Sequence, residues 1–224
     1  CWGPGFEPQA DHQREVFRNE DLFFFWPSYI QYSYLQDLIE QDIKNMQQLY
    51  INSFDHPLYQ KFINLYRVSF PIFEQRTEKQ QDKAFKNNKY KLLAFSEGVN
   101  LIGFISYWEF ADYLYIEHFA INTDIRGKGY GSKILGSFIL STNKVILLEI
   151  DPIIDEVSAA RLRFYDKCGF HTNQYSHYHP PYHEEYPAHS LIILTTKRQI
   201  TEEEYRMFDS DLNETVMNKT DLYV

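Results

Sequence analysis

Cysteine, long apolar runs and surplus positive charge are all scarce in this chain. Its two cysteines, Cys1 and Cys168, are too few for a disulfide framework, so a reducing cytoplasm is the simplest expected compartment. No apolar run approaches the roughly 20 residues that cross a bilayer, so we expect no membrane partner. The formal net charge of −9 argues against a nucleic-acid partner and suits a cationic or amine partner better.

Apolar and aromatic residues are plentiful, at 44% and 17% of the 224 residues. That is enough material for one sizeable core. We therefore expect one main domain over residues 44–224, preceded by an extension of unknown role over residues 1–43. Hydrophobic spacing predicts a helix within the extension, over residues 34–43.

The first half of the main domain changes from helical to strand periodicity. Apolar side chains at three- and four-residue steps predict a helix over residues 58–70, and a more polar helix follows over about residues 76–85. Three strand-like runs come next, and their short connections imply an antiparallel meander. These runs cover residues 90–96, 101–110 and 113–121.

The second half alternates between helices and strands. A glycine-rich turn leads into a helix, which is followed by a strand, a helix capped by Asp155, another strand and a last helix that opens with the capping box Thr201-x-x-Glu204. The intervening stretch from Tyr175 to His189, rich in histidine, tyrosine and proline, is interpreted as an irregular loop. The predicted strands cover residues 145–150 and 191–196, and the helix between them covers residues 155–167.

The glycine-rich turn carries the clearest chemical signal. Glycines let successive backbone N–H groups converge, and the helix that starts there adds partial positive charge, which together suit a pyrophosphate. A dinucleotide fold is excluded because the turn follows a meander and no acidic residue ends a second parallel strand. A P-loop is excluded because the Gly-Lys-Ser/Thr ending is missing.

Two motifs lie in the glycine-rich turn and in the helix over residues 155–167. Arg126-x-x-Gly129-x-Gly131, after a strand ending Phe119-Ala120-Ile121, is similar to the Arg/Gln-x-x-Gly-x-Gly/Ala signature of the GNAT family of acetyl-CoA-dependent N-acetyltransferases. The helix that holds Ser158 and the run Phe164 to Phe170 is similar to a second family block. The resemblance spans about residues 90–170 and implies an α/β fold with a mixed, mostly antiparallel sheet, splayed between its fourth and fifth strands and flanked by helices.

The resemblance also implies where acetyl-CoA, the co-substrate, would bind. The fourth strand would pair with the pantetheine arm, the turn amides would hold the pyrophosphate, and Arg126 would donate beside it. Serine stands at position 158 where many members have asparagine, and its hydroxyl could still donate one hydrogen bond. The expected cofactor-binding residues are Phe119, Ala120, Ile121, Arg126, Gly127, Lys128, Gly129, Tyr130, Gly131, Ser132 and Ser158.

Catalysis in the family is direct attack by an amine on the thioester. Tyr165 matches the family tyrosine that returns a proton to the leaving thiolate, although a tyrosine packed in the core would look the same in sequence. Glu117 is the first candidate to accept the amine proton, because alternation along the strand puts it on the face of Phe119, with His118 on the opposite face in a packing or hydrogen-bonding role. A solvated carboxylate, or an anchor for a cationic substrate, is the alternative reading of Glu117. Glu149, at the end of the fifth strand, is the second candidate.

The acceptor side of the cleft is expected to involve Phe70, Tyr178 and Tyr182, whose rings could hold an amine by cation–π contact or could be ordinary core and surface aromatics. The close spacing of His177, His179 and His183 is compatible with a metal site. The surrounding prolines and tyrosines favour a substrate loop instead, so we expect no metal.

The function predicted from these residues is transfer of an acetyl group from acetyl-CoA to a primary amine on a small molecule or peptide. A non-catalytic acyl-CoA-binding sensor or partner module of the same fold is the alternative. The sequence leaves the acceptor open, and a homodimer is one arrangement compatible with it.

Overall fold

The computed structural model describes residues 46–217. The predicted extension, its helix and the boundary at residue 43 all lie outside these residues. Within the described range, no helix is long and apolar enough to cross a membrane.

The first half of the described chain confirms the predicted helices and the meander. The second helix begins at the side chain of Thr77, which closes a capping box with Gln80. Strand β2 pairs antiparallel with β3, and β3 pairs antiparallel with β4. The elements are β1 (Gln47–Tyr50), α2 (Tyr59–Ser69), the 3-10 turn η2 (Ile72–Glu74), α3 (Glu78–Lys86), β2 (Tyr90–Glu97), β3 (Asn100–Glu109) and β4 (Tyr113–Ile121).

The second half confirms the alternation of helices and strands. Asp155 caps α5 by accepting the backbone N–H of Ser158 at 2.7 Å, as predicted, and Thr201 and Glu204 form the predicted capping box. The elements are η3 (Thr123–Ile125), α4 (Tyr130–Leu140), β5 (Val145–Ile150), α5 (Glu156–Lys167), β6 (Phe170–Thr172), β7 (His177–His179), β8 (His189–Thr196), α6 (Glu202–Asp211) and the π-helical turn η4 (Leu212–Val216).

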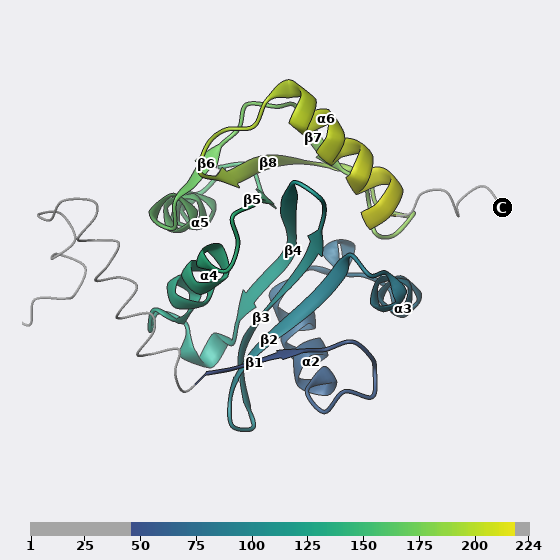
Figure 1. Cartoon of the computed structure of the whole chain (residues 1–224), viewed down its shortest axis with the longest axis vertical. Coiled ribbons are helices and arrows are strands. Elements are labelled where there is room, and N and C mark those ends of the chain that lie inside the picture. The colour runs from purple at the N-terminus through teal and green to yellow at the C-terminus, as the bar shows by residue number, and fades with distance from the viewer. Residues whose placement is uncertain (1–45, 218–224) are drawn as a thin grey trace, which may run out of the picture. The chain divides into compact units, whose positions relative to one another are not determined.

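All the described strands join in one sheet in the order β1-β2-β3-β4-β5-β8-β6, with β7 paired to β8 (Figure 1). Every pairing is antiparallel except that of β4 with β5, which is parallel. A parallel pair needs a crossover, and α4 supplies it between these two strands. The mixed, mostly antiparallel sheet predicted from the sequence is therefore confirmed.

Two apolar cores lie on opposite faces of the sheet (Figure 1). One buries side chains of α2, α3 and α6, including Phe62, Ala84 and Phe208. The other buries the inner face of α4, with Ile134 and Leu135 fully buried, and receives partly buried residues of α5. Because β4 contributes side chains to both cores, each of its residues faces either the α2 side or the α4 side of the sheet.

The interpretation of the histidine-rich stretch as an irregular loop is wrong in part. His177, Tyr178 and His179 form β7, which pairs with Leu191, Ser190 and His189 of β8. The two histidines are buried and the tyrosine between them is exposed, as the two-residue period of a strand requires.

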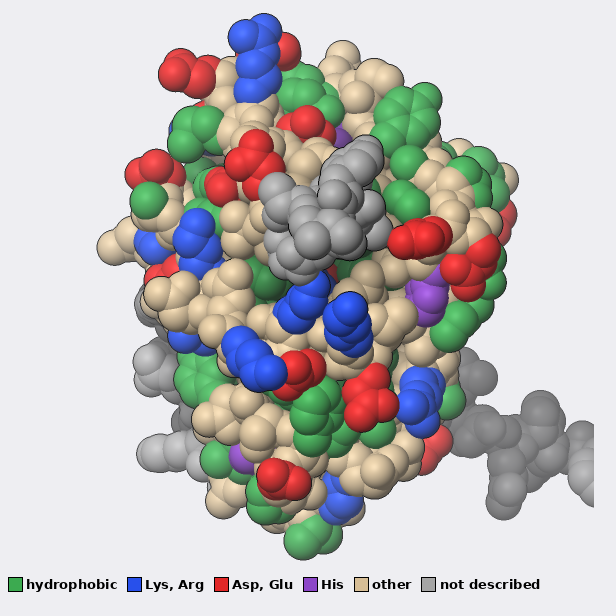
Figure 2. Space-filling model, turned by 90° about the vertical axis from the view of Figure 1, so that its right-hand side faces the viewer, with side chains coloured by type: hydrophobic (Ala, Val, Ile, Leu, Met, Phe, Trp, Pro, Cys, Tyr) green, Lys and Arg blue, Asp and Glu red, His purple; other side chains and the backbone are tan. Residues whose placement is uncertain are grey.

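The surface near α3 carries both signs of charge. On the face shown in Figure 2, acidic and basic side chains are interspersed. Within α3, Lys86 and Asp82 form an ion pair, with 2.6 Å between the Nζ and Oδ2 atoms. The net negative charge of the chain is therefore not gathered into one acidic patch on this face.

Candidate active site

The parallel pair β4–β5 opens into a fork. Its last matched residues are Ile116 and Leu148, and beyond them β4 continues to Ile121 while β5 turns to pair with β8 alone (Figure 1). Within residues 46–217, the edge of β4 that faces the fork therefore has no strand partner from Glu117 to Ile121. Free backbone groups on such an edge can pair with an extended ligand.

A β-bulge occurs at the point where the strands part. Ser106 is matched with His118 and Tyr107 with Ile116, which leaves Glu117 without a partner on β3. The extra residue rotates the side chains that follow it. Glu117 and His118 therefore both contact residues on the α2 side, whereas Phe119 packs in the core on the α4 side. The prediction that Glu117 shares a face with Phe119 and opposes His118 is wrong for this reason.

The Glu117 carboxylate is buried and has three partners inside the protein. It accepts hydrogen bonds from Trp108 Nε1 and the Tyr182 hydroxyl, both at 2.8 Å, and its Oε1 lies 2.6 Å from Arg76 Nη2. Burial by itself raises the pKa of this carboxyl, but Arg76, His118 and the two hydrogen bonds outweigh burial and hold the pKa below its usual value. A carboxylate with these partners is a poor proton acceptor, which argues against the first candidate base.

His118 has the hydrogen-bonding role expected from the sequence. Its Nε2 donates to the carbonyl oxygen of Glu74 at 2.9 Å, which leaves Nδ1 to accept from the Ser106 hydroxyl at 3.2 Å. Burial lowers the pKa of His118 to about 4, so the ring is neutral near pH 7. His118 thereby fixes the segment after α2 against the bulge.

Glu149, the second candidate base, is the first residue of β5 beyond the fork. It accepts from the Tyr115 hydroxyl at 2.5 Å and from His177 Nε2, and His179 Nε2 lies 3.9 Å from its Oε2. Burial raises the pKa of Glu149, but His179, His177 and Tyr115 together hold it below its usual value. Glu149 is therefore an ionised carboxylate near pH 7.

A half-buried cluster of three titratable side chains lies close to these residues. Ligand-type atoms of Glu74, Asp151 and His189 all lie within 4.8 Å of one another. Asp151 is already paired with Arg161, at 2.5 Å. Burial first, and then Asp151, raise the pKa of Glu74 to about 7.

The glycine-rich turn has the geometry that an anion requires. Gly127 and Gly129 have φ values of +77° and +79°, in the left-handed region that favours glycine. Gly129 is the N-cap of α4 and no side chain of the described residues caps this helix, so within this part of the chain the first-turn N–H groups are left for another acceptor. Arg126 is exposed and its Nε donates to the Ile121 carbonyl at 3.1 Å, which ties the turn to the end of β4. The turn fits a pyrophosphate.

The Ser158 hydroxyl is committed to the start of α5. It accepts the backbone N–H groups of Ile154 and Asp155 at 3.0 and 3.1 Å, and Asp155 oxygens take its single proton. The predicted hydrogen bond from Ser158 to the cofactor would break this cap, so the structure argues against it.

Tyr165 lies on α5, on the α4 side of the sheet, with its ring against Phe164 and Phe170. Burial raises its pKa to about 12, so the phenol keeps its proton at neutral pH. No hydrogen bond joins its hydroxyl to another described residue, unlike the buried tyrosines on the α2 side. Cys168 is also protonated, because burial raises the pKa of its thiol to about 11.

The aromatic residues predicted for the acceptor side separate into three environments. Phe70 packs edge-on against His118, with ring centroids 4.7 Å apart. Tyr182 is buried, and its hydroxyl is held by Glu117. Tyr178 is 58% exposed and points away from the face that buries its neighbours on β7, so it does not line the fork.

The three histidines considered for a metal site do not converge. His177 is directed to Glu149, whereas His183 Nε2 is 2.9 Å from the Gln75 carbonyl oxygen. His179 Nδ1 is 2.6 Å from the carbonyl oxygen of Pro180. Each ring thus has its own protein partner.

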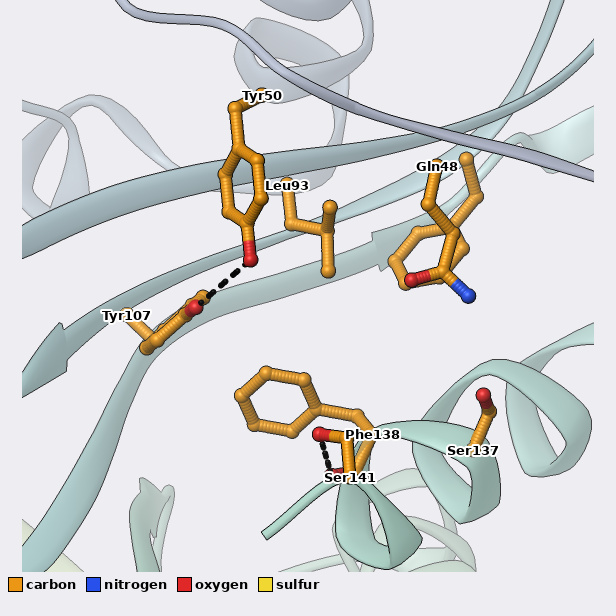
Figure 3. A pocket seen from close by; sticks show the side chains of 8 residues that line it. Gln48, Tyr50, Leu93, Tyr107, Ser137, Phe138 and Ser141 are labelled. Carbon is orange, nitrogen blue, oxygen red and sulfur yellow. Dashed lines mark hydrogen bonds between the residues drawn. The ribbon is translucent and has the colours of Figure 1, made fainter.

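A pocket lies elsewhere on the protein, between the first strands and α4 (Figure 3). The Tyr50 and Tyr107 hydroxyls meet across it at 3.3 Å. It contains none of the residues predicted from the sequence to bind or react. Its lining comes from Gln48, Tyr50, Leu93, Phe95, Tyr107, Ser137, Phe138 and Ser141.

Sequence reasoning missed several residues near the fork, namely Arg76, Trp108, Tyr115, Glu74, Asp151 and His189. Their contacts join segments far apart in the chain, and no local pattern indicates them. His179 had a usable signal, since His177-x-His179 has the two-residue period of a strand with one face buried.

Known proteins that resemble this chain in sequence or structure are acetyltransferases. Residues 57–170 match the sequence model of the acetyltransferase (GNAT) family. A putative GNAT-family acetyltransferase from Bacteroides thetaiotaomicron has 26% sequence identity and a TM-score of 0.71, over 77% of this chain and 98% of that one. Arabidopsis thaliana Naa50, solved with the bisubstrate analogue CoA-Ac-MVNAL, shares the fold at 18% identity and a TM-score of 0.50, over 69% of this chain and 99% of that one. No curated protein sequence matches the chain.

Proposed function

The chain belongs to the GNAT family of acetyltransferases, with acetyl-CoA as co-substrate, and from this premise we propose that it transfers the acetyl group to a primary amine at the β4–β5 fork. The observation that supports this most strongly is the end of parallel pairing at Ile116 and Leu148, together with the order strand, glycine turn and helix, in which no described side chain caps the start of α4. Acetyl-CoA supplies the thioester that an amine nitrogen attacks.

The α4 side of the fork would hold the cofactor. We propose that the backbone of Phe119, Ala120 and Ile121 pairs with the pantetheine arm, since this edge of β4 has no strand partner. The turn amides would bind the pyrophosphate, with Arg126 beside them. The residues proposed for the turn are Gly127, Lys128, Gly129, Tyr130, Gly131 and Ser132.

Tyr165 is proposed to return a proton to the departing sulfur. Three features support it: the phenol is protonated at neutral pH, its hydroxyl has no partner among the described residues, and its helix packs against Phe119 through Phe164. General acid catalysis of this kind contributes about 10²–10⁴-fold to a rate.

The acceptor would approach from the α2 side of the sheet. The glycine-rich turn, α4 and α5, which are assigned to the cofactor, occupy the other side. Phe70 and the Tyr182 loop border this side. The acidic balance of the chain favours a cationic acceptor. The compartment and a homodimer stay predictions.

The test is acetyl transfer itself. Purified protein is incubated with acetyl-CoA and a panel of small amines, polyamines and peptides with free amino termini, while thiol release is followed and products are weighed by mass spectrometry. An acetylated product together with released thiol supports the proposal. Thiol release that does not depend on any amine would contradict it.

A further inference from the structure

Both carboxylates at the fork are buried among hydrogen-bond donors that hold their pKa below its usual value, so both are weak acceptors of the amine proton. Glu117 accepts from Arg76, Trp108 and Tyr182, and Glu149 accepts from Tyr115 and His177. Among the described residues, the imidazole of His179 on β7 lies beside Glu149, and its Nε2 atom receives no hydrogen bond. We propose that His179 is the general base, through its Nε2 atom, and that Glu149 positions and stabilises it. This inference rests on the proposed function.

The tautomer of His179 is set by its backbone partner. A carbonyl oxygen can only accept, so Nδ1, at 2.6 Å from the oxygen of Pro180, carries the proton. In the neutral ring, Nε2 therefore has a free lone pair. The side chain is only 3% exposed, and no described residue donates a hydrogen bond to Nε2.

The position of His179 links both arms of the fork. Its Nε2 lies 3.9 Å from Glu149 Oε2 on β5, too far for a hydrogen bond and close enough for a strong charge interaction in a buried site. Its ring stacks on Tyr182 at 5.2 Å between centroids, and the Tyr182 hydroxyl is bonded to Glu117 on β4. Tyr165, by contrast, packs in the core on the α4 side of the sheet.

One ionised carboxylate faces the ring of His179. It belongs to Glu149, whose Oε2 lies 3.9 Å from Nε2 and would attract the imidazolium formed in the reaction. The other titratable groups facing the ring are His118 on β4, His189 on β8, whose ring centroid is 6.0 Å away, and Tyr182. His118 is neutral, and His189, whose pKa is lowered first by burial, lies beside the carboxylates of Glu74 and Asp151.

The reaction balances with these groups. The lone pair of a neutral amine forms the C–N bond while the C–S bond of the thioester breaks. The proton shed by nitrogen goes to His179 Nε2, and the Tyr165 hydroxyl gives its proton to the departing sulfur. Transfer of the proton from His179 to Tyr165 through solvent restores both residues, with no net gain or loss.

The experiment compares wild-type protein with His179→Asn, whose amide can still donate to Pro180, and with His179→Ala. His171→Asn, an exposed histidine on β6, is the matched control. We expect kcat/KM for an amine found in the panel to fall about 10²–10⁴-fold in both His179 variants, with unchanged acetyl-CoA affinity by calorimetry. Added imidazole should restore part of the rate of His179→Ala, whereas a purely structural role would give no rescue.

A second measurement uses the wild-type protein alone, so it does not depend on any variant being folded in full. The imidazole of His179 in the wild-type protein is titrated by NMR, and its midpoint is compared with the pH below which kcat/KM falls. Coincidence of the two supports the proposal, and separation by more than one pH unit overturns it. An active wild type with an equally active His179→Asn variant would overturn this inference alone. A wild-type protein inactive on every amine would contradict both the proposed function and this inference.

Discussion

The Nη2 atom of Arg76 lies 2.6 Å from the Oε1 atom of Glu117, and the two side chains are 5% and 0% exposed. The pair joins the segment after α2 to the bulge in β4. Arg76 also lies over the rings of Trp108 and Tyr182, at 5.4 and 5.6 Å from their centroids. The fork is thus held on its α2 side by one buried ion pair surrounded by aromatic rings.

Breaking this pair should cost stability. Glu117→Gln leaves the Arg76 cation buried without its counter-ion, so we expect the free energy of unfolding to fall by about 3–5 kcal/mol. Arg76→Met/Glu117→Gln removes the unpaired charge and should recover part of that loss. Denaturant unfolding of the two single variants and the double variant measures both effects. A loss of unfolding free energy in the double variant larger than the sum of the losses in the two single variants would contradict this account.

Tyr165→Phe separates proton transfer from binding. The change deletes one hydroxyl that has no partner among the described residues, so folding and acetyl-CoA affinity should be unchanged. We expect kcat to fall roughly 10²-fold or more. Steady-state kinetics gives kcat and calorimetry gives the acetyl-CoA affinity. Tyr178→Phe, on the exposed side of β7, is the control. A Tyr165→Phe rate equal to wild type would exclude the acid role.

Glu74 should make stability depend on pH. Its pKa is raised from 4.5 to about 7, so the folded protein binds this proton more tightly than the unfolded chain. The resulting stability is present at low pH and is lost as the pH rises from about 4.5 to about 7. Glu74→Gln should therefore raise the free energy of unfolding at pH 8 by about 1–2 kcal/mol, a figure discounted for partial exposure, and change it little at pH 4.

Thermal unfolding of Glu74→Gln at the two pH values tests this, with Glu203→Gln on the exposed face of α6 as control. Equal shifts at both pH values would show that the effect is not the titration of Glu74.

The sequence was sufficient to predict the helices and the longer strands and to locate the glycine-rich turn, but β1, β6 and β7 were not predicted. Residues 113–121 and 145–150 were predicted as strands with the bounds that the structure has, because apolar alternation and short connections are local signals. The glycine-rich turn was found for the same reason, since left-handed φ values at Gly127 and Gly129 require glycine locally.

The α2 side could not be predicted to the same degree. Alternation along β4 assumed an unbroken strand, and the bulge at Glu117 reversed the face of every later residue. The partners of Glu117 come from Arg76, Trp108 and Tyr182, and only tertiary packing brings them together. Ser158 shows the opposite case, because a capping box explains a residue that the family pattern had assigned to the cofactor.

The most direct test of the central claim is calorimetric titration of acetyl-CoA into the wild-type protein and into Gly129→Glu. That change places a carboxylate, and a strained left-handed residue, at the N-cap of α4 where the pyrophosphate would bind. Gly98→Glu is the control, because Gly98 also has a positive φ, +55°, but lies in the β2–β3 hairpin. The account predicts micromolar-range binding to the wild type and to Gly98→Glu, and loss of binding in Gly129→Glu. Equal affinity of Gly129→Glu and wild type would contradict the proposed cofactor site, and no binding to the wild type would contradict the proposed function.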